Sequence, residues 1–254
     1  MGKQCLGPED SNVAAWLINL GTVLTHENKF QEAEALYREA LATNRKLLGN
    51  EHREVATCLN NLAKVLAKEG KLAEAEPLLR EALQMFRRLY GDEHPLVARG
   101  LTSLTWILWH EARLQEAEAA GREALALQKK LSPSPDNPDV ANAMANLAGV
   151  LEAEGNLQEA EAIQRDVLAM RRRVLGEEHP LVAQSLHEVG NLVSKRGNLS
   201  EAESTLRESL AMTRKLPVND YVDTATVLAD LAKVLTAEGK SSEAKALIEG
   251  EPNK

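Results

Sequence analysis

A pattern of about 42 residues recurs six times in this 254-residue chain. One copy reads LNNLAKVLAKEGKLAEAEPLLREAL at Leu59–Leu83. The phase of the pattern is marked, at spacings of 42, 42, 43, 42 and 42 residues, by Leu20, Leu62, Leu104, Leu147, Val189 and Leu231. The longer step falls in LSPSPDNPDV, which has one residue more than LYGDEHPLV. A fixed period of this length predicts a solenoid, in which each repeat packs only against its neighbours.

Each copy contains two segments with the apolar spacing of an α-helix. In the second copy, the first segment has apolar residues three and four positions apart, at Val55, Leu59, Leu62 and Leu66. Gly70 then suits the left-handed end of a helix, and a second helix is expected from about Leu72 to Tyr90. No segment alternates with a period of two, so no strands are expected. The sequence therefore predicts an all-α superhelix of about six helix-pair repeats.

This second copy resembles a tetratricopeptide repeat. It has the Leu62-Ala63 pair, the turn residue Gly70, and two alanines seven residues apart, Ala75 and Ala82. The 42-residue period and linkers such as YGDEHPLVA resemble the kinesin light chain-like subclass of that family. The resemblance implies a right-handed α-α superhelix, the TPR solenoid, whose first helices line a concave groove that binds a protein or peptide ligand.

The register of the repeat sets the expected domain boundaries. We expect residues 1–9 to be the tail of a missing preceding repeat, and residues 250–254 to be a C-terminal tail. The array between them, 10–249, is expected to consist of repeats 10–51, 52–93, 94–136, 137–178, 179–220 and 221–249. Neither end has an obvious polar capping helix, which solenoids usually need, so we expect a piece of a longer array or of a multidomain chain.

Composition and charge argue against several classes of partner. The chain has 30 Lys and Arg against 38 Asp and Glu, a net charge of −8, which disfavours nucleic acid and anionic membranes. No apolar run approaches the ~18 residues of a membrane span, and the opening MGKQCLGPED lacks the apolar core of a signal peptide. Cys5 and Cys58 have no metal or redox spacing. We therefore expect a cytoplasmic monomer, with end-to-end association through uncapped termini as the alternative.

The histidines of the linker have a structural interpretation. His52, His94 and His179 recur there, but neighbouring repeats lie about 10 Å apart, whereas a zinc ligand lies ~2 Å from its ion. We interpret these histidines as linker structure and predict no metal site. No nucleophile, phosphate-binding or dinucleotide-binding motif is present, so no catalytic residues are predicted, and neither an enzyme nor a cofactor is expected.

Paired carboxylates and one cysteine also have simple interpretations. Acidic pairs recur in the second helices, as at Glu32 and Glu34 or at Glu159 and Glu161. We expect both members of each pair on the solvated face. Cys58 lies on the inner side of a first helix and is expected to be a small buried residue.

The predicted binding site lies on the face of the first helices that points away from their apolar stripe. The resemblance places this face in the concave groove. The candidate residues for a peptide-binding groove are Asn19, Asn60, Asn61, Lys64, Lys68, Arg99, Ser103, Trp106, Trp109, His110 and Asn146.

One position of this face is asparagine in several copies of the repeat, and we call the equivalent residues the asparagine column. Asn61 recurs as Asn19 and Asn146, while Ser103, Glu188 and Asp230 hold the other copies. Related arrays use such an asparagine to hydrogen-bond an extended peptide, and the amide can both donate and accept. The alternative is a hydrogen bond between helices that fixes the stacking of repeats. Both interpretations remain open at this point.

Charge is expected to divide the groove into two halves. The N-terminal half carries Lys64, Lys68 and Arg99. The C-terminal half carries Glu152, Glu188 and Asp230, which Lys195 and Lys233 partly offset. This polarity would orient an extended ligand with its acidic end toward the second and third repeats.

The third repeat departs from the pattern with two tryptophans. Trp106 stands where the second copy has Lys64, and it points about 200° away from Leu104 at ~100° per residue. Trp109 stands where the second copy has Ala67. Opposite them, the fourth repeat offers small residues, namely Ala145, Gly149 and Ala153. Either the indoles fold onto this surface and stiffen the stack, or the two sets form an apolar pocket for a ligand side chain.

These observations predict a protein–protein interaction scaffold that binds a short peptide segment of a partner. A second hypothesis is a regulatory or sensor module of a larger signalling protein, whose kinase or nucleotidase part would lie outside this sequence. A third is an architectural spacer with an empty groove.

Overall fold

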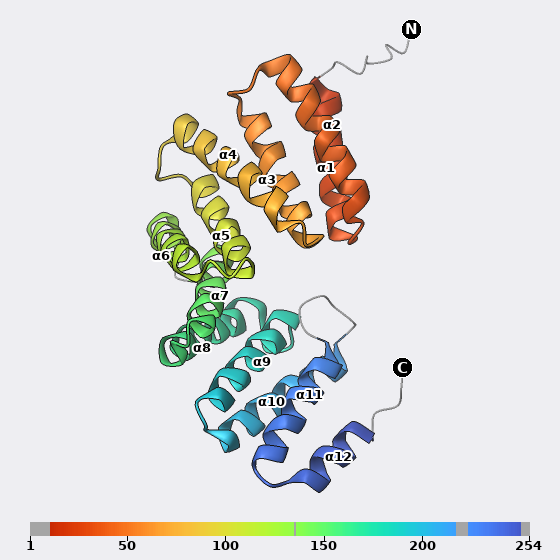
Figure 1. Ribbon diagram of the computed structural model, residues 1–254, viewed down its shortest axis with the longest axis vertical. Helices are drawn as coiled ribbons and strands as arrows, with labels where there is room; N and C mark the ends of the chain where they lie inside the picture. Colours follow the sequence, from red (N-terminus) through yellow and green to blue (C-terminus); the bar gives the residue numbers. More distant parts are fainter. Residues whose placement is uncertain (1–10, 135, 217–222, 250–254) are drawn as a thin grey trace. The chain divides into compact units, whose positions relative to one another are not determined.

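The computed structural model describes residues 11–134, 136–216 and 223–249, and within these ranges the chain forms twelve α-helices and no strands (Figure 1). The helices are α1 (Ser11–His26), α2 (Phe30–Leu48), α3 (Arg53–Lys68), α4 (Leu72–Tyr90), α5 (Pro95–His110), α6 (Leu114–Leu131), α7 (Pro138–Ala153), α8 (Leu157–Leu175), α9 (Pro180–Lys195), α10 (Leu199–Lys215), α11 (Thr224–Ala237) and α12 (Ser241–Glu249). Odd-numbered helices are the first helices of the repeats, and even-numbered helices are the second helices. The predicted tails at 1–9 and 250–254 lie outside the described residues.

Helices pack in the order in which they occur in the sequence. Each first helix packs on the second helix of its own repeat, and α2, α4, α8 and α10 pack on the first helix that follows. The chain divides into two compact units, one with α1–α6 and one with α7–α12. The prediction of an all-α solenoid of helix pairs is confirmed.

The core consists of the apolar stripes that the sequence predicts. In α3, Val55, Leu59 and Leu66 are fully buried, and Leu62 is nearly so. Cys58 is buried too, as expected. Small residues allow the helices to approach closely, since a Cβ atom added at Gly100 would meet Leu83 Cδ2 at 2.6 Å.

The linker histidines are N-caps of the first helices. The Nδ1 atoms of His52, His94 and His179 accept hydrogen bonds from the backbone N–H two residues later, at 3.2, 3.2 and 3.1 Å. Asn137 caps α7 in the same way, at 2.8 Å. These bonds satisfy N–H groups that a helix leaves unpaired at its start. The interpretation of the histidines as linker structure is confirmed.

The turn between the two helices of a repeat needs a left-handed residue. Glycine supplies it in most repeats, for example Gly70 (φ 78°) and Gly155 (φ 84°). In the first repeat Asn28 takes this conformation (φ 59°), and in the third Ala112 does (φ 58°). An alanine in this region carries a steric cost that glycine avoids.

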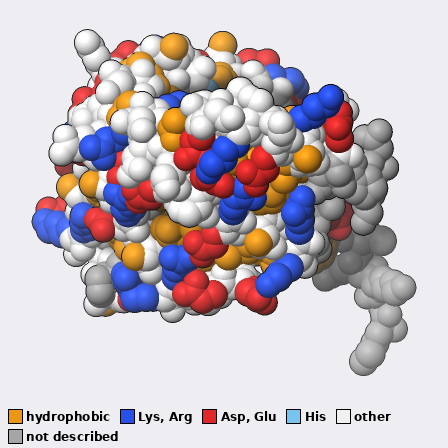
Figure 2. Space-filling view, turned by 90° about the horizontal axis from the view of Figure 1, so that it is seen from below, with side chains coloured by type: hydrophobic (Ala, Val, Ile, Leu, Met, Phe, Trp, Pro, Cys, Tyr) orange, Lys and Arg blue, Asp and Glu red, His pale blue; other side chains and the backbone are white. Residues whose placement is uncertain are grey.

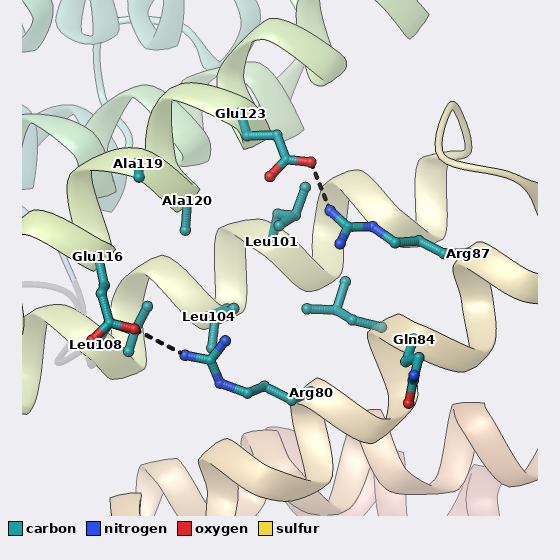
Figure 3. A pocket seen from close by; sticks show the side chains of 11 residues that line it. Arg80, Gln84, Arg87, Leu101, Leu104, Leu108, Glu116, Ala119, Ala120 and Glu123 are labelled. Carbon is teal, nitrogen blue, oxygen red and sulfur yellow. Dashed lines mark hydrogen bonds and ion pairs between the residues drawn. The ribbon is translucent and has the colours of Figure 1, made fainter.

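Second helices of consecutive repeats are joined by ion pairs 36 residues apart. In Figure 3, Arg80 reaches Glu116 at 3.4 Å and Arg87 reaches Glu123 at 2.6 Å. The same pairing joins Arg38–Glu74, Arg45–Glu81, Arg165–Glu201, Arg172–Glu208 and Arg207–Glu243. Figure 2 shows basic and acidic side chains interleaved over one face of the molecule. Each such exposed pair contributes ~1 kcal/mol at most, so the series serves mainly to fix register.

In each of the two acidic pairs of the second helices, one glutamate is buried. Glu34 and Glu161 are only 6% and 3% exposed, which corrects the expectation for these two residues. Glu161 is held by Arg165 and by Arg196, the latter at 2.6 Å. A charge can be buried here because basic side chains from its own helix and from the next repeat neutralise it.

Candidate functional site

Ten of the eleven predicted site residues lie on the first helices of the first unit. Asn19 is on α1, the four residues Asn60, Asn61, Lys64 and Lys68 are on α3, and α5 carries Arg99, Ser103, Trp106, Trp109 and His110. We call this set the first-helix face. α3 contacts both α1 and α5, so the three helices present the face side by side. The eleventh residue, Asn146, lies on α7 in the other unit.

An aromatic cluster occupies the C-terminal end of α5. The ring of Trp106 stacks on His110 with centroids 3.8 Å apart, and Trp109 meets His110 edge-on at 4.7 Å. His110 Nδ1 lies 2.8 Å from the carbonyl oxygen of Trp106, which fixes the imidazole. The two indoles are half-buried, whereas His110 is exposed. The cluster therefore combines apolar surface with a polar edge that solvent reaches.

Two cations of the first-helix face are uncompensated. Lys68 and Arg99 are exposed, and neither makes an ion pair within the described part of the chain. By contrast, cations of the second helices such as Arg45, Arg80 and Arg87 all reach a carboxylate. Positive charge is thus left available on this face.

The asparagine column is already partly engaged in hydrogen bonds. Asn60 Nδ2 donates to Asn61 Oδ1 at 3.2 Å, and Ser103 Oγ donates to the carbonyl oxygen of Arg99 at 3.1 Å. The amide nitrogen of Asn61 donates in none of the bonds found within the described residues. Asn61 therefore retains donor capacity for a ligand.

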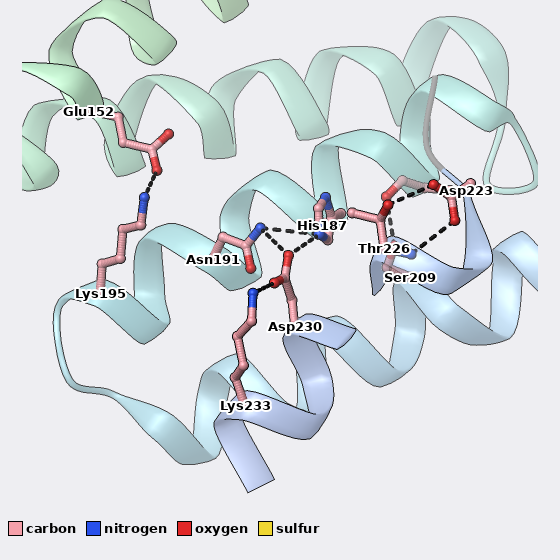
Figure 4. Close-up of polar contacts among 10 residues, drawn as sticks. Glu152, His187, Asn191, Lys195, Ser209, Asp223, Thr226, Asp230 and Lys233 are labelled. Atoms are coloured by element: carbon pink, nitrogen blue, oxygen red, sulfur yellow. Dashed lines mark hydrogen bonds and ion pairs between the residues drawn. The ribbon is translucent and has the colours of Figure 1, made fainter. Parts of the chain in front are cut away.

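In the second unit, the equivalent face holds a closed polar network (Figure 4). The carboxylate of Asp230 on α11 receives His187 Nε2 at 2.8 Å, Asn191 Nδ2 at 3.1 Å and Lys233 Nζ at 2.7 Å. Lys195 pairs with Glu152 at 2.5 Å. Most of the acidic surface predicted for this half is thus neutralised internally. Asp230 holds the position of the asparagine column in the sixth repeat. It joins two first helices by hydrogen bonds, as the alternative interpretation of this column expects.

The pKa values of two carboxyl groups on this face move in opposite directions. Partial burial disfavours the charge of Asp230, but hydrogen bonds from Lys233, His187 and Asn191 hold its pKa below the ordinary value. Burial raises the pKa of Glu188, and the nearby Glu152 carboxylate adds to that rise. The network therefore stabilises the charged form of Asp230, whereas the charged form of Glu188 is disfavoured.

Sequence reasoning missed His187 and Asn191 as members of this network. Their signal was present, because they lie four residues apart on one face of a helix, 43 and 39 residues before Asp230. The predicted pocket between Trp106, Trp109 and the small residues of α7 joins the two units and stays a prediction.

Other kinds of site find little support in the described residues. No cluster of three or more His, Cys, Asp or Glu side chains that could hold a metal ion occurs among them. No helix in the part of the chain that the structure describes combines the length and apolar character needed to span a bilayer.

Paired helices in sequential contact, with left-handed turns and 42-residue spacing, define a helix-pair solenoid. The tetratricopeptide repeat family matches residues 12–88, 54–130 and 139–215, and the chain belongs to this family. No curated protein matches the chain in sequence.

Several solved structures share the fold. BtubC (BKLC) from P. vanneervenii is 21% identical, with a TM-score of 0.73 over 89% of this chain and 94% of the other. The nearly identical TPR-like repeats of a protein described as a kinesin light chain from Podosopora anserina are 25% identical, with a TM-score of 0.67 over 83% of this chain and 98% of the other. A chain in the structure of the APC/C hetero-tetramer Cut9–Hcn1 is 17% identical, with a TM-score of 0.70 over 96% of this chain and 41% of the other. The chain is thus similar to kinesin light chain-like repeats, as its linkers predict.

Proposed function

We propose that the chain is a protein-interaction scaffold that binds a short, extended peptide on its first-helix face. Tetratricopeptide repeats generally serve as scaffolds for protein interactions. One observation carries the finer proposal: the unpaired Lys68 and Arg99 share this face with the stacked Trp106 and His110. The ligand is therefore a peptide that carries acidic residues and at least one apolar or aromatic side chain.

The charge of the two faces supports this choice of ligand. An acidic peptide gains from cations that pair with no carboxylate of the described residues, because no such ion pair must be broken on binding. On the equivalent face of the second unit, Lys195 and Lys233 are already paired with Glu152 and Asp230. That face offers less to an acidic ligand.

The aromatic cluster supports an anchoring role. Trp and Arg are the residues that most often dominate binding energy at interfaces. The indoles of Trp106 and Trp109 are half-buried, so part of their apolar surface is accessible to a ligand without any rearrangement of the core. A ligand ring or aliphatic side chain packing on them would be fixed beside Arg99.

We also propose a cytoplasmic location and no catalytic role. Burial raises the pKa of the Cys58 thiol to about 11, so this free cysteine stays protonated and unreactive at neutral pH. A free buried thiol is typical of a reducing compartment.

The proposal is tested with an array of short peptides that vary in acidic and aromatic content, probed with the full chain. We expect the binders to carry both features. Replacing Lys68 or Arg99 with glutamate should weaken the best peptide by about tenfold, whereas Lys233→Glu on the other unit should not. Binders without acidic residues would refute the proposed ligand class.

A second experiment separates binding from packing at the tryptophans. Replacing Trp106 and Trp109 with alanine should weaken peptide binding by ~2 kcal/mol or more and lower stability by less than ~1.5 kcal/mol. Trp16→Ala, on another surface, is the control and should leave peptide affinity unchanged. A large loss of stability with intact binding would show that the indoles only pack, and would move the site to the asparagine column.

A further inference from the structure

His110 differs from the linker histidines in the ring nitrogen that carries the hydrogen. Its Nδ1 lies 2.8 Å from the carbonyl oxygen of Trp106, and a carbonyl oxygen can only accept a hydrogen bond. The hydrogen is therefore on Nδ1. In the linkers, by contrast, Nδ1 of His52, His94 and His179 accepts a backbone N–H, which leaves the hydrogen of the neutral ring on Nε2.

The second ring nitrogen of His110 is consequently an acceptor when the ring is neutral. A neutral imidazole has only one N–H, so Nε2 carries a lone pair. Nε2 makes no hydrogen bond to the residues that the structure describes, and His110 is exposed, so a ligand can reach this atom. In this form His110 accepts a hydrogen bond from a hydroxyl or amide group. It offers nothing to a carboxylate, which has no hydrogen to donate.

A second proton on the ring reverses this preference. Protonated His110 donates from Nε2 and is positively charged, so a carboxylate accepts a charge-assisted hydrogen bond from it. The position of Nε2 is the same in both forms, because the ring stays stacked on Trp106 with centroids 3.8 Å apart. Imidazole is the side chain that changes charge between about pH 5 and 8. The pH therefore decides which chemical group this ring binds.

The carboxylates near this end of α5 are already paired with Arg113. They are Glu111 of the turn at 3.2 Å, Glu76 of α4 at 2.7 Å and Glu116 of α6 at 2.7 Å. On α3, which packs beside α5, the first-helix face carries the cations Lys64 and Lys68. His110 itself pairs with no carboxylate of the described residues. The counter-charge for a protonated His110 is therefore left to a ligand.

We propose that His110 determines the specificity of the first-helix face through its charge, binding a carboxylate of the ligand peptide when protonated and a hydroxyl or amide hydrogen when neutral. This inference rests on the peptide-binding function proposed above and adds its regulation. Since a carboxylate favours the protonated ring, binding of an acidic peptide takes up a proton. Its affinity therefore rises as the pH falls from about 8 to about 5.5, where the carboxylates of the peptide, with an ordinary pKa of ~4, are still charged.

The test compares a carboxylate with its amide at the same place in a peptide. The probes are the tightest-binding peptide of the array described above and copies in which one carboxylate at a time is replaced by the matching amide. Affinities for the full chain are measured at about pH 8 and about pH 5.5. For one of the copies, we expect the carboxylate to be preferred about tenfold at the lower pH and less than about twofold at the higher. The ratio of the two affinities cancels any effect that pH has elsewhere in the chain.

Variants of the chain assign the effect to this imidazole. His110→Gln cannot gain a charge, so its preference should be the same at both pH values. The control is His26→Gln, at an exposed histidine that holds the equivalent position on α1, and it should keep the change of preference. Calorimetric titration in two buffers of different ionisation enthalpy should show proton uptake on binding by the unaltered chain and by His26→Gln. The uptake should be lost in His110→Gln.

The hydrogen on Nδ1 can be observed without any ligand. Nitrogen NMR of the free chain at about pH 8 should show a protonated Nδ1 and an unprotonated Nε2 at His110. The reverse tautomer would overturn the proposal. A carboxylate preference that is independent of pH, or one that still changes with pH in His110→Gln, would overturn it as well, while peptide binding itself stays intact. Failure of the proposed function is recognised differently, because no peptide of the array would then bind at either pH, and the role of His110 would fall with it.

Discussion

His187 Nε2 on α9 lies 2.8 Å from Asp230 Oδ2 on α11, so two consecutive first helices are joined by one hydrogen bond. His187 is only 7% exposed, and Asn191 donates to the same oxygen at 3.1 Å. Because both donors come from α9, the carboxylate of Asp230 fixes how α11 stacks on it.

Replacing Asp230 with alanine should therefore destabilise the chain by about 1–3 kcal/mol at neutral pH, because the buried imidazole loses its partner. The pKa of Asp230 is lowered in the folded state, so its contribution is present above the ordinary pKa and is lost as the pH falls through the folded value. Urea denaturation between pH 7 and acid measures both effects. The control Asp92→Ala, at a carboxylate that is 85% exposed, should stay within ~0.5 kcal/mol.

The neighbouring Glu188 should behave in the opposite way. Burial raises its pKa, so its charged form costs stability at neutral pH, and this cost disappears as the pH falls below the ordinary pKa of ~4.3. Glu188→Gln is expected to raise Tm at pH 7 and to have no such benefit in acid. An unchanged or lower Tm at pH 7 would show that the charge of Glu188 does not destabilise the folded chain.

Glu203 is a matched control for Glu188, because its pKa is shifted in the opposite direction. Hydrogen bonds from Lys240 and Arg207 lower its pKa to about 2. Its stabilising contribution is therefore present above the ordinary pKa and fades as the pH falls toward 2. Glu203→Gln should lower Tm at pH 7, and the difference from the unaltered chain should shrink in acid.

The turn of the third repeat should be improved by glycine. Ala112 holds the left-handed conformation that glycine holds at Gly155, so Ala112→Gly removes a steric cost of ~1–2 kcal/mol, partly offset by the freedom of glycine in the unfolded chain. We expect a net gain of about 0.5–1 kcal/mol in urea denaturation. The reverse change, Gly155→Ala, should lose a similar amount. A loss of stability on both substitutions would mean that the turns are not equivalent.

The close approach of α4 and α5 makes Gly100 intolerant of a side chain. A methyl group there would meet Leu83 Cδ2 at 2.6 Å, so Gly100→Ala should cost ~1–3 kcal/mol despite the better helix propensity of alanine. In a double-mutant cycle with Leu83→Ala, the penalty should shrink, because the clashing branch is gone. Additive penalties would show that the contact is not the cause.

The sequence by itself determined the repeating unit. The apolar spacing of Val55, Leu59 and Leu66 is a property of one helix, and the left-handed turn at Gly70 depends on its own backbone, so both could be derived from local rules. The helix pairs, their phase and the family followed from these features. The outward direction of Trp106 was also predictable from the helical period.

Only the tertiary structure decided what each polar side chain does. Glu34 and Glu161 looked solvated on their own helix, but cations that include Lys71 and Arg196 of the next repeat reach them. His187 and Asp230 meet across 43 residues of sequence. Trp16 has the phase of a core residue, yet it is exposed because none of the described helices covers that side of α1. A periodic sequence specifies each repeat, whereas burial and charge pairing depend on which surface the next helix reaches, and that is fixed only when the repeats pack.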